Sequence, residues 1–103
     1  MIARYWRGWA TKANADAYET MLRTKILPSI FRVKGYRGAY ILRREVADMY
    51  EIATITLWDN MESVKEFAGA DFHKAVVTPE AQKLLKNFDT TSLHYEVLME
   101  PGK

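Results

Sequence analysis

Two β-rich runs, residues 36–46 and residues 49–58, are separated by only Ala47 and Asp48. A connection of two residues is long enough for an antiparallel hairpin, whereas parallel strands need a crossover of a dozen or more residues. Both runs are rich in the β-branched and aromatic residues that favour strands. The sequence therefore predicts a β-hairpin at the centre of the chain.

A further β-rich segment lies near each end of the chain. Residues 2–9 are rich in aromatic residues and lack helical periodicity, which predicts a strand. Residues 91–99 alternate, with Leu93 on one face and His94 on the other, which predicts the last strand.

The segment between the first strand and the hairpin has apolar residues at helical spacing. Thr11 or Asn14 is placed to cap this helix at its start. Pro28 lacks an N–H group and clashes with the preceding turn, so we expect the helix to kink or stop near Leu27.

The segment after the hairpin predicts two or three short helical pieces. Asp59 and Glu62 resemble a capping box at the start of the first piece. Thr78 at the N-cap and Pro79 at the first helical position open another piece, which we expect to carry Phe88 inward.

The predicted order is β-α-β-β-α-β, which defines an α+β fold of the ferredoxin-like type. This fold has a four-stranded antiparallel sheet with both helices on one face. We expect one domain over residues 1–100 and a tail over residues 101–103. Neither face of the sheet is polar, and no sequence remains to cover the second face. We therefore expect a homodimer in which two copies pack sheet against sheet.

Composition excludes several classes of protein. The 103 residues contain no Cys, which rules out disulfides and thiolate chemistry. The net charge of +2 is too small to indicate a nucleic-acid partner. Residues 37–41 faintly resemble an RNA-recognition signature, but they enter the second strand rather than the third. Apolar runs are short and interrupted by Arg4 and Arg7, so we expect no membrane partner and a cytoplasmic location.

Four motifs occur in an order that is typical of one known family. They are residues 2–6, residues 35–38, residues 57–59 followed by Glu62 and Phe67, and residues 94–97. With these motifs the chain resembles the antibiotic biosynthesis monooxygenase family of dimeric α/β-barrel proteins. The resemblance covers nearly the whole chain and implies the fold more strongly than any one reaction. Members include cofactor-independent oxygenases of polycyclic phenols, haem-degrading enzymes and small proteins of unassigned role.

The haem-degrading members carry an Asn on the first strand, a Trp on a helix and, about three turns later, a His that ligates iron. The positions that look equivalent here hold Trp6 or Gly8, Phe67 and Val77, so the resemblance disfavours haem degradation. His73 lies six residues from Phe67 and would project elsewhere on a helix, which favours a surface role.

Two ionisable residues are the candidate catalytic groups. His94, in the middle of the last strand, is the candidate base for removing a proton from a phenolic substrate. Its alternative role is a buried His hydrogen-bonded within the sheet or across the dimer. Arg4 is the candidate group for stabilising an enolate or phenolate oxyanion, or else pairs with Glu51 or Glu96 as part of the structure.

Three aromatic residues are the candidate substrate-binding residues. Trp6, Tyr40 and Trp58 would give flat apolar walls for an aromatic ligand, although aromatic residues in strands are most often core residues. We expect no metal site, because the two His residues lie on different elements without carboxylates at ligand spacing. No bound cofactor is expected either, since Gly35 and Gly38 precede a strand rather than a helix.

The sequence thus predicts a pocket between sheet and helices that takes a small apolar or aromatic ligand. One hypothesis is cofactor-independent monooxygenation of an aromatic or polyketide-like substrate. The alternative is a non-catalytic ligand-binding or stress-related protein on the same scaffold.

Overall fold

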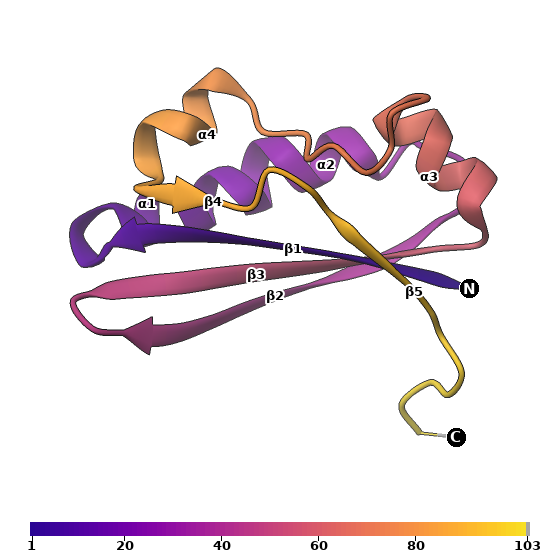
Figure 1. Ribbon diagram of the computed structural model, residues 1–103, viewed down its shortest axis with the longest axis horizontal. Helices are drawn as coiled ribbons and strands as arrows, with labels where there is room; N and C mark the ends of the chain where they lie inside the picture. The colour runs from indigo at the N-terminus through magenta and orange to yellow at the C-terminus, as the bar shows by residue number, and fades with distance from the viewer. Residues whose placement is uncertain (103) are drawn as a thin grey trace.

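The computed structural model describes residues 1–102, and Lys103 of the predicted tail lies outside the described residues. One antiparallel sheet runs through the molecule in the order β2-β3-β1-β4, with β5 also paired to β1 (Figure 1). Its strands are β1 (Ile2–Thr11), β2 (Tyr36–Val46), β3 (Met49–Trp58), β4 (Asn87–Phe88) and β5 (Leu93–Glu96).

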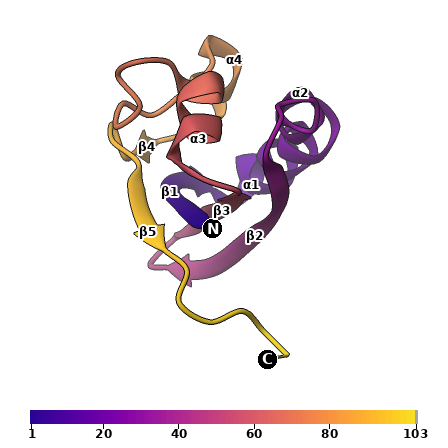
Figure 2. The ribbon, with the colours of Figure 1, turned by 90° about the vertical axis from the view of Figure 1, so that its right-hand side faces the viewer.

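The helices all lie on one face of this sheet, as Figures 1 and 2 show. They are α1 (Lys12–Met21), η1 (Leu22–Ile26), α2 (Leu27–Ile30), α3 (Met61–Ala68) and α4 (Pro79–Leu84). The predicted α+β, ferredoxin-like architecture is confirmed, with β4 and β5 together filling the place of the fourth strand. None of the helices within residues 1–102 has the length and apolar character needed to span a bilayer.

The first helix does not stop near Leu27 but continues past Pro28, and the irregularity predicted there takes the form of a wider helical turn just before Leu27. The chain widens into the π-helical turn η1, in which the Leu27 N–H donates to the Leu22 carbonyl, five residues back. A wider turn gives the proline ring room against the preceding turn and leaves no α-helical hydrogen bond for Pro28 to break. The helix then runs on through Ile30, where its buried face packs on the sheet.

The central hairpin forms as predicted. Val46 pairs with Met49 across the two-residue connection, and the pairing continues to Tyr36 and Trp58 at the other end. Ala47 takes a φ of 56°, a left-handed backbone conformation that tight hairpin turns require.

The fourth strand is interrupted rather than continuous over residues 91–99, and the last helix ends at Leu84 instead of reaching Phe88. Between β4 and β5, residues 89–92 turn partly toward the segment before α4 instead of continuing the ladder with β1. The Ala75 N–H donates to the Thr90 carbonyl at 2.9 Å, and the Ser92 N–H donates to the His73 carbonyl at 2.7 Å. These two hydrogen bonds hold the segment before α4 against the edge of the sheet.

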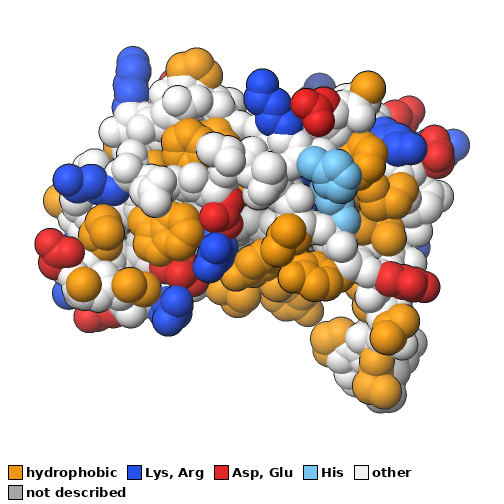
Figure 3. Space-filling view, viewed as in Figure 1, with side chains coloured by type: hydrophobic (Ala, Val, Ile, Leu, Met, Phe, Trp, Pro, Cys, Tyr) orange, Lys and Arg blue, Asp and Glu red, His pale blue; other side chains and the backbone are white. Residues whose placement is uncertain are grey.

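Alternation along the strands gives the sheet two different faces. Even-numbered positions of β1 face the helices, where Ala10 is fully buried in the core and Trp6 packs beside it. The opposite face is not covered by any element within residues 1–102 (Figure 2). It exposes large apolar side chains. Figure 3 shows hydrophobic side chains gathered along the lower edge of the molecule and on the segment that follows β5. We define the open face by its exposed residues Tyr40, Leu42, Leu93 and Tyr95.

Candidate functional site

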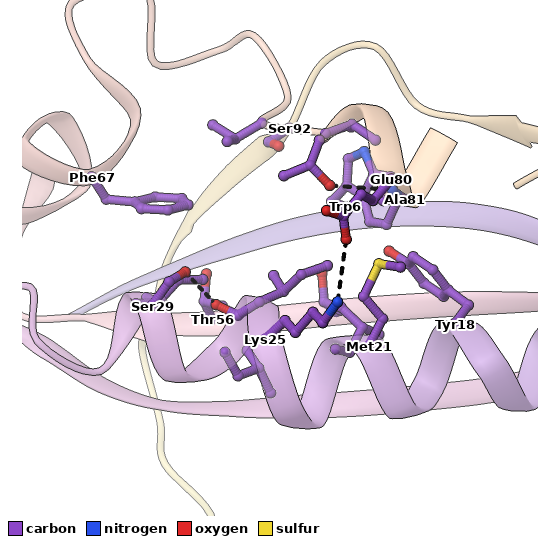
Figure 4. Close-up of a pocket in the computed structure, with 18 of the residues that line it drawn as sticks. Trp6, Tyr18, Met21, Lys25, Ser29, Thr56, Phe67, Glu80, Ala81 and Ser92 are labelled. Carbon is purple, nitrogen blue, oxygen red and sulfur yellow. Dashed lines mark hydrogen bonds and ion pairs between the residues drawn. The ribbon is translucent and has the colours of Figure 1, made fainter. Parts of the chain in front are cut away.

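A cavity of about 380 Å³ lies between the helix-covered face of the sheet and the helices. One wall comes from β1 and β3, the opposite wall from the long helix α1-η1-α2, and the remaining sides from α3, α4 and residues 76–78. Figure 4 shows Phe67 and Met21 among the side chains around it. All of these walls belong to one chain, so the cavity does not need a second copy to enclose it.

Trp6, one of the predicted substrate-binding residues, supplies a flat part of the sheet wall. Its indole N–H donates to the Asp89 carbonyl at 2.7 Å, so the interruption of the fourth strand fixes the orientation of the ring. Gly8 makes space beside it, since a Cβ atom there would lie 2.8 Å from Cη2 of Trp6. The indole ring of Trp6 therefore packs over Gly8, the position on β1 that has no side chain.

Arg4 lines the cavity, and only 5% of its surface is exposed. Nη1 donates to the Phe72 carbonyl and to Nε2 of His94 at 2.9 Å, while Nη2 donates to the Lys74 carbonyl at 3.3 Å. Burial lowers the pKa of Arg4 from its ordinary value, but a guanidinium remains charged in proteins. Within residues 1–102, Arg4 forms an ion pair neither with Glu51, which pairs with Arg44, nor with Glu96.

His94 lies behind Arg4 and does not line the cavity itself. A guanidinium only donates, so Nε2 must be the accepting nitrogen and the imidazole proton sits on Nδ1. Nδ1 is buried without a hydrogen-bond partner in residues 1–102. Burial, and then the charges of Arg4 and His73, lower the pKa of His94. The neutral imidazole thus acts as an acceptor for Arg4.

Trp58 is fully buried and lies one layer behind the cavity. Its indole N–H donates to Oγ1 of Thr56 at 2.9 Å, and its ring stacks on Phe67 with centroids 5.4 Å apart. Phe67 and Thr56 line the cavity, so Trp58 supports the wall instead of forming it.

Tyr40 lies outside the cavity, on the open face, where 47% of its surface is exposed. It pairs with Ile55, whose neighbours Thr54 and Thr56 point to the cavity side. Because residues on a strand alternate between faces, Tyr40 must point away from Trp6. The predicted grouping of Tyr40 with Trp6 in one pocket is corrected accordingly.

The helix-side wall is not predicted from the sequence as part of a site. Lys25 in η1 and Glu80 in α4 form an ion pair at 3.4 Å, drawn as a dashed line in Figure 4. Both side chains are about two-thirds exposed, at 67% and 64%, which puts the pair at the solvent side of the cavity. The sequence does contain a signal for this wall, because the helical spacing of Tyr18, Met21 and Lys25 places all three on one face of the first helix.

No protein-family model and no curated protein matches the sequence. Solved structures do match the fold over nearly the whole chain. A proposed antibiotic biosynthesis monooxygenase from Bacillus cereus has a TM-score of 0.68 and 13% identity, covering 100% of this chain and 96% of that one. The haem degrader MhuD from Mycobacterium tuberculosis, solved with two haems in its active site, has a TM-score of 0.60 and 17% identity, covering 99% and 100%.

A third similar structure is the monooxygenase ActVA-Orf6 of Streptomyces coelicolor in complex with nanaomycin D. Its TM-score is 0.59 at 11% identity, and the match covers 98% of this chain and 92% of that one. At such identities the likeness establishes the fold. The chain therefore has the ferredoxin-like fold of antibiotic biosynthesis monooxygenase-type proteins, as the sequence resemblance implies.

Haem is the one cofactor that these structures name, so its fit to this cavity matters. Neither His73 nor His94 lines the cavity, which therefore offers no imidazole ligand to a haem iron. Phe67 and Val77 do line it, but their hydrocarbon side chains cannot coordinate a metal. The positions that the resemblance would assign to haem binding thus hold no ligand for the iron.

Proposed function

We propose that the protein is a cofactor-independent monooxygenase of small aromatic or polyketide-like substrates, which bind in the cavity between sheet and helices. The observation that carries this proposal is the buried guanidinium of Arg4 in a cavity otherwise walled largely by apolar side chains. Trp6 and Phe67 offer faces for an aromatic ring. Arg4 offers a positive charge to an oxygen of the ligand.

The charge of Arg4 favours the ionised form of a phenolic or enolic substrate. In a water-poor cavity such a charge has a larger effect than in bulk water, so it lowers the pKa of the bound hydroxyl group. The resulting enolate is electron-rich and is the form that reacts with molecular oxygen. For an anthrone, one oxygen atom becomes the new carbonyl, and the other leaves as water with the two hydrogens removed from that carbon.

His94 enters this mechanism through Arg4. Its Nε2 accepts a hydrogen bond from Nη1 of Arg4. The imidazole therefore holds the guanidinium against the cavity and does not itself need to reach the substrate. A small displacement of a charged group in a site costs on the order of 10²-fold in rate. We therefore expect His94→Ala to lower turnover at least about tenfold.

Oxygen uptake with a panel of anthrones tests the proposal. We expect uptake by the native protein, with one quinone formed per oxygen consumed, and a loss of at least about 10²-fold in Arg4→Gln. Arg37→Gln, which changes an exposed arginine of β2 paired with Asp59, is the matched control and should retain the rate. Binding of the anthrones without oxygen uptake would show that the protein is a ligand-binding protein instead.

We also propose that two copies associate through the open face. Tyr40, Leu42, Leu93 and Tyr95 are each about half exposed there, at 47%, 46%, 51% and 54%. Contiguous apolar surface of this kind marks interaction sites, and a second identical sheet is a complementary cover for it. This association leaves the cavity on the outer, helix-covered side of each copy.

A further inference from the structure

Among the buried or partly buried charges within residues 1–102, Arg4 differs from the others in lacking an ionic partner. Arg7 pairs with Asp89 at 3.0 Å and Glu51 pairs with Arg44 at 3.1 Å, both closer to solvent than Arg4. Within residues 1–102, no ion pair joins Arg4 to an Asp or Glu side chain. A buried charge is costly unless it is paired, so the missing negative charge is expected from outside the chain.

The hydrogen bonds of Arg4 leave one edge of its guanidinium group for a ligand. Of the five N–H groups of a guanidinium, three donate to the Phe72 carbonyl, the Lys74 carbonyl and Nε2 of His94. Nη1 uses both of its hydrogens. The N–H of Nε and one N–H of Nη2 have no acceptor in the described part of the chain. Two N–H groups on neighbouring nitrogens match two oxygens that share one charge.

We propose that the ligand of this cavity presents two neighbouring oxygen atoms sharing one negative charge, which accept hydrogen bonds from Nε and Nη2 of Arg4. This inference rests on the proposed function, since it assigns the chemical class of the ligand at the same site. A carboxylate has this pair of oxygens, and so does an ionised hydroxyl group conjugated with a neighbouring ketone, as in tropolone. Both are anions in which the charge is delocalised over the pair.

The surroundings of Arg4 fit a ligand of this kind. Its guanidinium carbon lies 5.6 Å from the centre of the Phe67 ring, and Phe67 and Trp6 both line the cavity. An aromatic ring between these walls places its anionic substituent at Arg4. The backbone carbonyls of Phe72 and Lys74, on the segment fastened by residues 89–92, hold the guanidinium from the other side.

Two matched pairs of probes test the inference on the unmodified protein. Calorimetry compares 2-naphthoate with the neutral 2-naphthamide, and ionised tropolone with the neutral 2-methoxytropone at mildly alkaline pH. We expect the anion to bind at least about tenfold more tightly in one pair, and that pair identifies the source of the two oxygens. Equal binding within both pairs overturns the inference but leaves an aromatic binding cavity. Failure of all four probes to bind overturns both the inference and the proposed cavity function.

Variants of the two cationic residues at the cavity then locate the anion. Arg4→Lys keeps the charge but not the paired donors, so we expect it to lose part of the preference for the anion. Arg4→Gln should lose the whole preference, and thermal melting by circular dichroism checks that both variants fold. Lys25→Gln is the matched control, because Lys25 lines the same cavity but already pairs with Glu80. Loss of the preference in Lys25→Gln alone would show that the anion binds at the solvent side of the cavity, and it would overturn the assignment to Arg4.

Discussion

The indole ring of Trp58 stacks on the ring of Phe67, with ring planes 21° apart and centroids 5.4 Å apart. Trp58 is fully buried, whereas Phe67 forms part of the cavity wall. The position and tilt of that wall are thus set by a residue that a ligand does not touch. Tyr36 packs edge-on against the same indole, with ring centroids 5.6 Å apart.

Trp58→Ala should strongly destabilise the fold. Removing a buried Trp leaves a cavity and costs about 3 to 5 kcal/mol, measured as the free energy of unfolding in urea. Trp58→Phe keeps a ring against Phe67 and should cost less. Phe31→Ala is the control, because 56% of Phe31 is exposed. A loss in Trp58→Ala no larger than in Phe31→Ala would contradict the stacked arrangement.

Gly8→Ala should displace the ring of Trp6. The added Cβ would lie 2.8 Å from Cη2 of Trp6, so the ring must shift, and 3.2 Å from a methyl group of Leu85, which must give way slightly. Overpacking of this kind costs about 1 to 3 kcal/mol in unfolding free energy. Trp6→Phe removes the contacting atom, so the double variant should be more stable than the sum of the single effects predicts. Strictly additive losses would show that the two residues do not meet.

The pH dependence of stability should contain a contribution from His94. Burial, and then the charges of Arg4 and His73, lower the pKa of His94 in the folded chain. As pH falls below the ordinary imidazole value of about 6.5, the unfolded chain takes up the proton first, and stability decreases. The decrease ends below the folded-state pKa, where both forms are protonated.

His94→Gln isolates this contribution, because the amide oxygen still accepts from Arg4 but does not titrate. The urea midpoint of this variant should fall less than that of the native protein between neutral and mildly acidic pH. His73→Gln should change the profile less than His94→Gln, because it removes only the charge of His73, the smallest of the three causes that lower the pKa of His94. Parallel pH profiles for His94→Gln and the native protein would rule out the contribution.

Leu42→Glu should prevent association through the open face. It places a charge where 46% of an apolar side chain is now exposed and where a partner sheet is proposed to lie. Sedimentation should report about twice the chain mass for the native protein and the single chain mass for this variant. Ala13→Glu adds the same charge at an exposed position of α1 and should leave the mass unchanged. A native protein that sediments as a single chain would exclude the association.

Local signals in the sequence predict much of the fold. The two-residue connection defines the hairpin, and Thr11 and Thr78 cap α1 and α4 with their hydroxyl oxygens, as their residue types predict. The capping box predicted at Asp59 does not form, because the N-cap of α3 is Asn60, whose side-chain oxygen accepts from the Ser63 N–H. Both residue types favour this position, so composition alone does not choose between them.

Features that depend on distant contacts are not predicted. The interruption of the fourth strand arises because residues 89–92 find partners at residues 73–75, which are far away in sequence. The contact between Arg4 and His94 likewise joins two strands whose register the sequence does not specify. Tyr40 is assigned to the wrong face because one residue of register reverses the direction of every side chain on a strand.

The alternation along β1 gives this strand two separable sets of positions. Arg4 and Trp6 border the cavity, whereas Tyr5 lies between them on the side of the open face. Substitutions can therefore change the lining of the cavity and the surface of the open face independently. A single inserted or deleted residue between Ile2 and Thr11 would instead exchange the two sets beyond that point, so the arrangement depends more strictly on the length of this strand than on its composition.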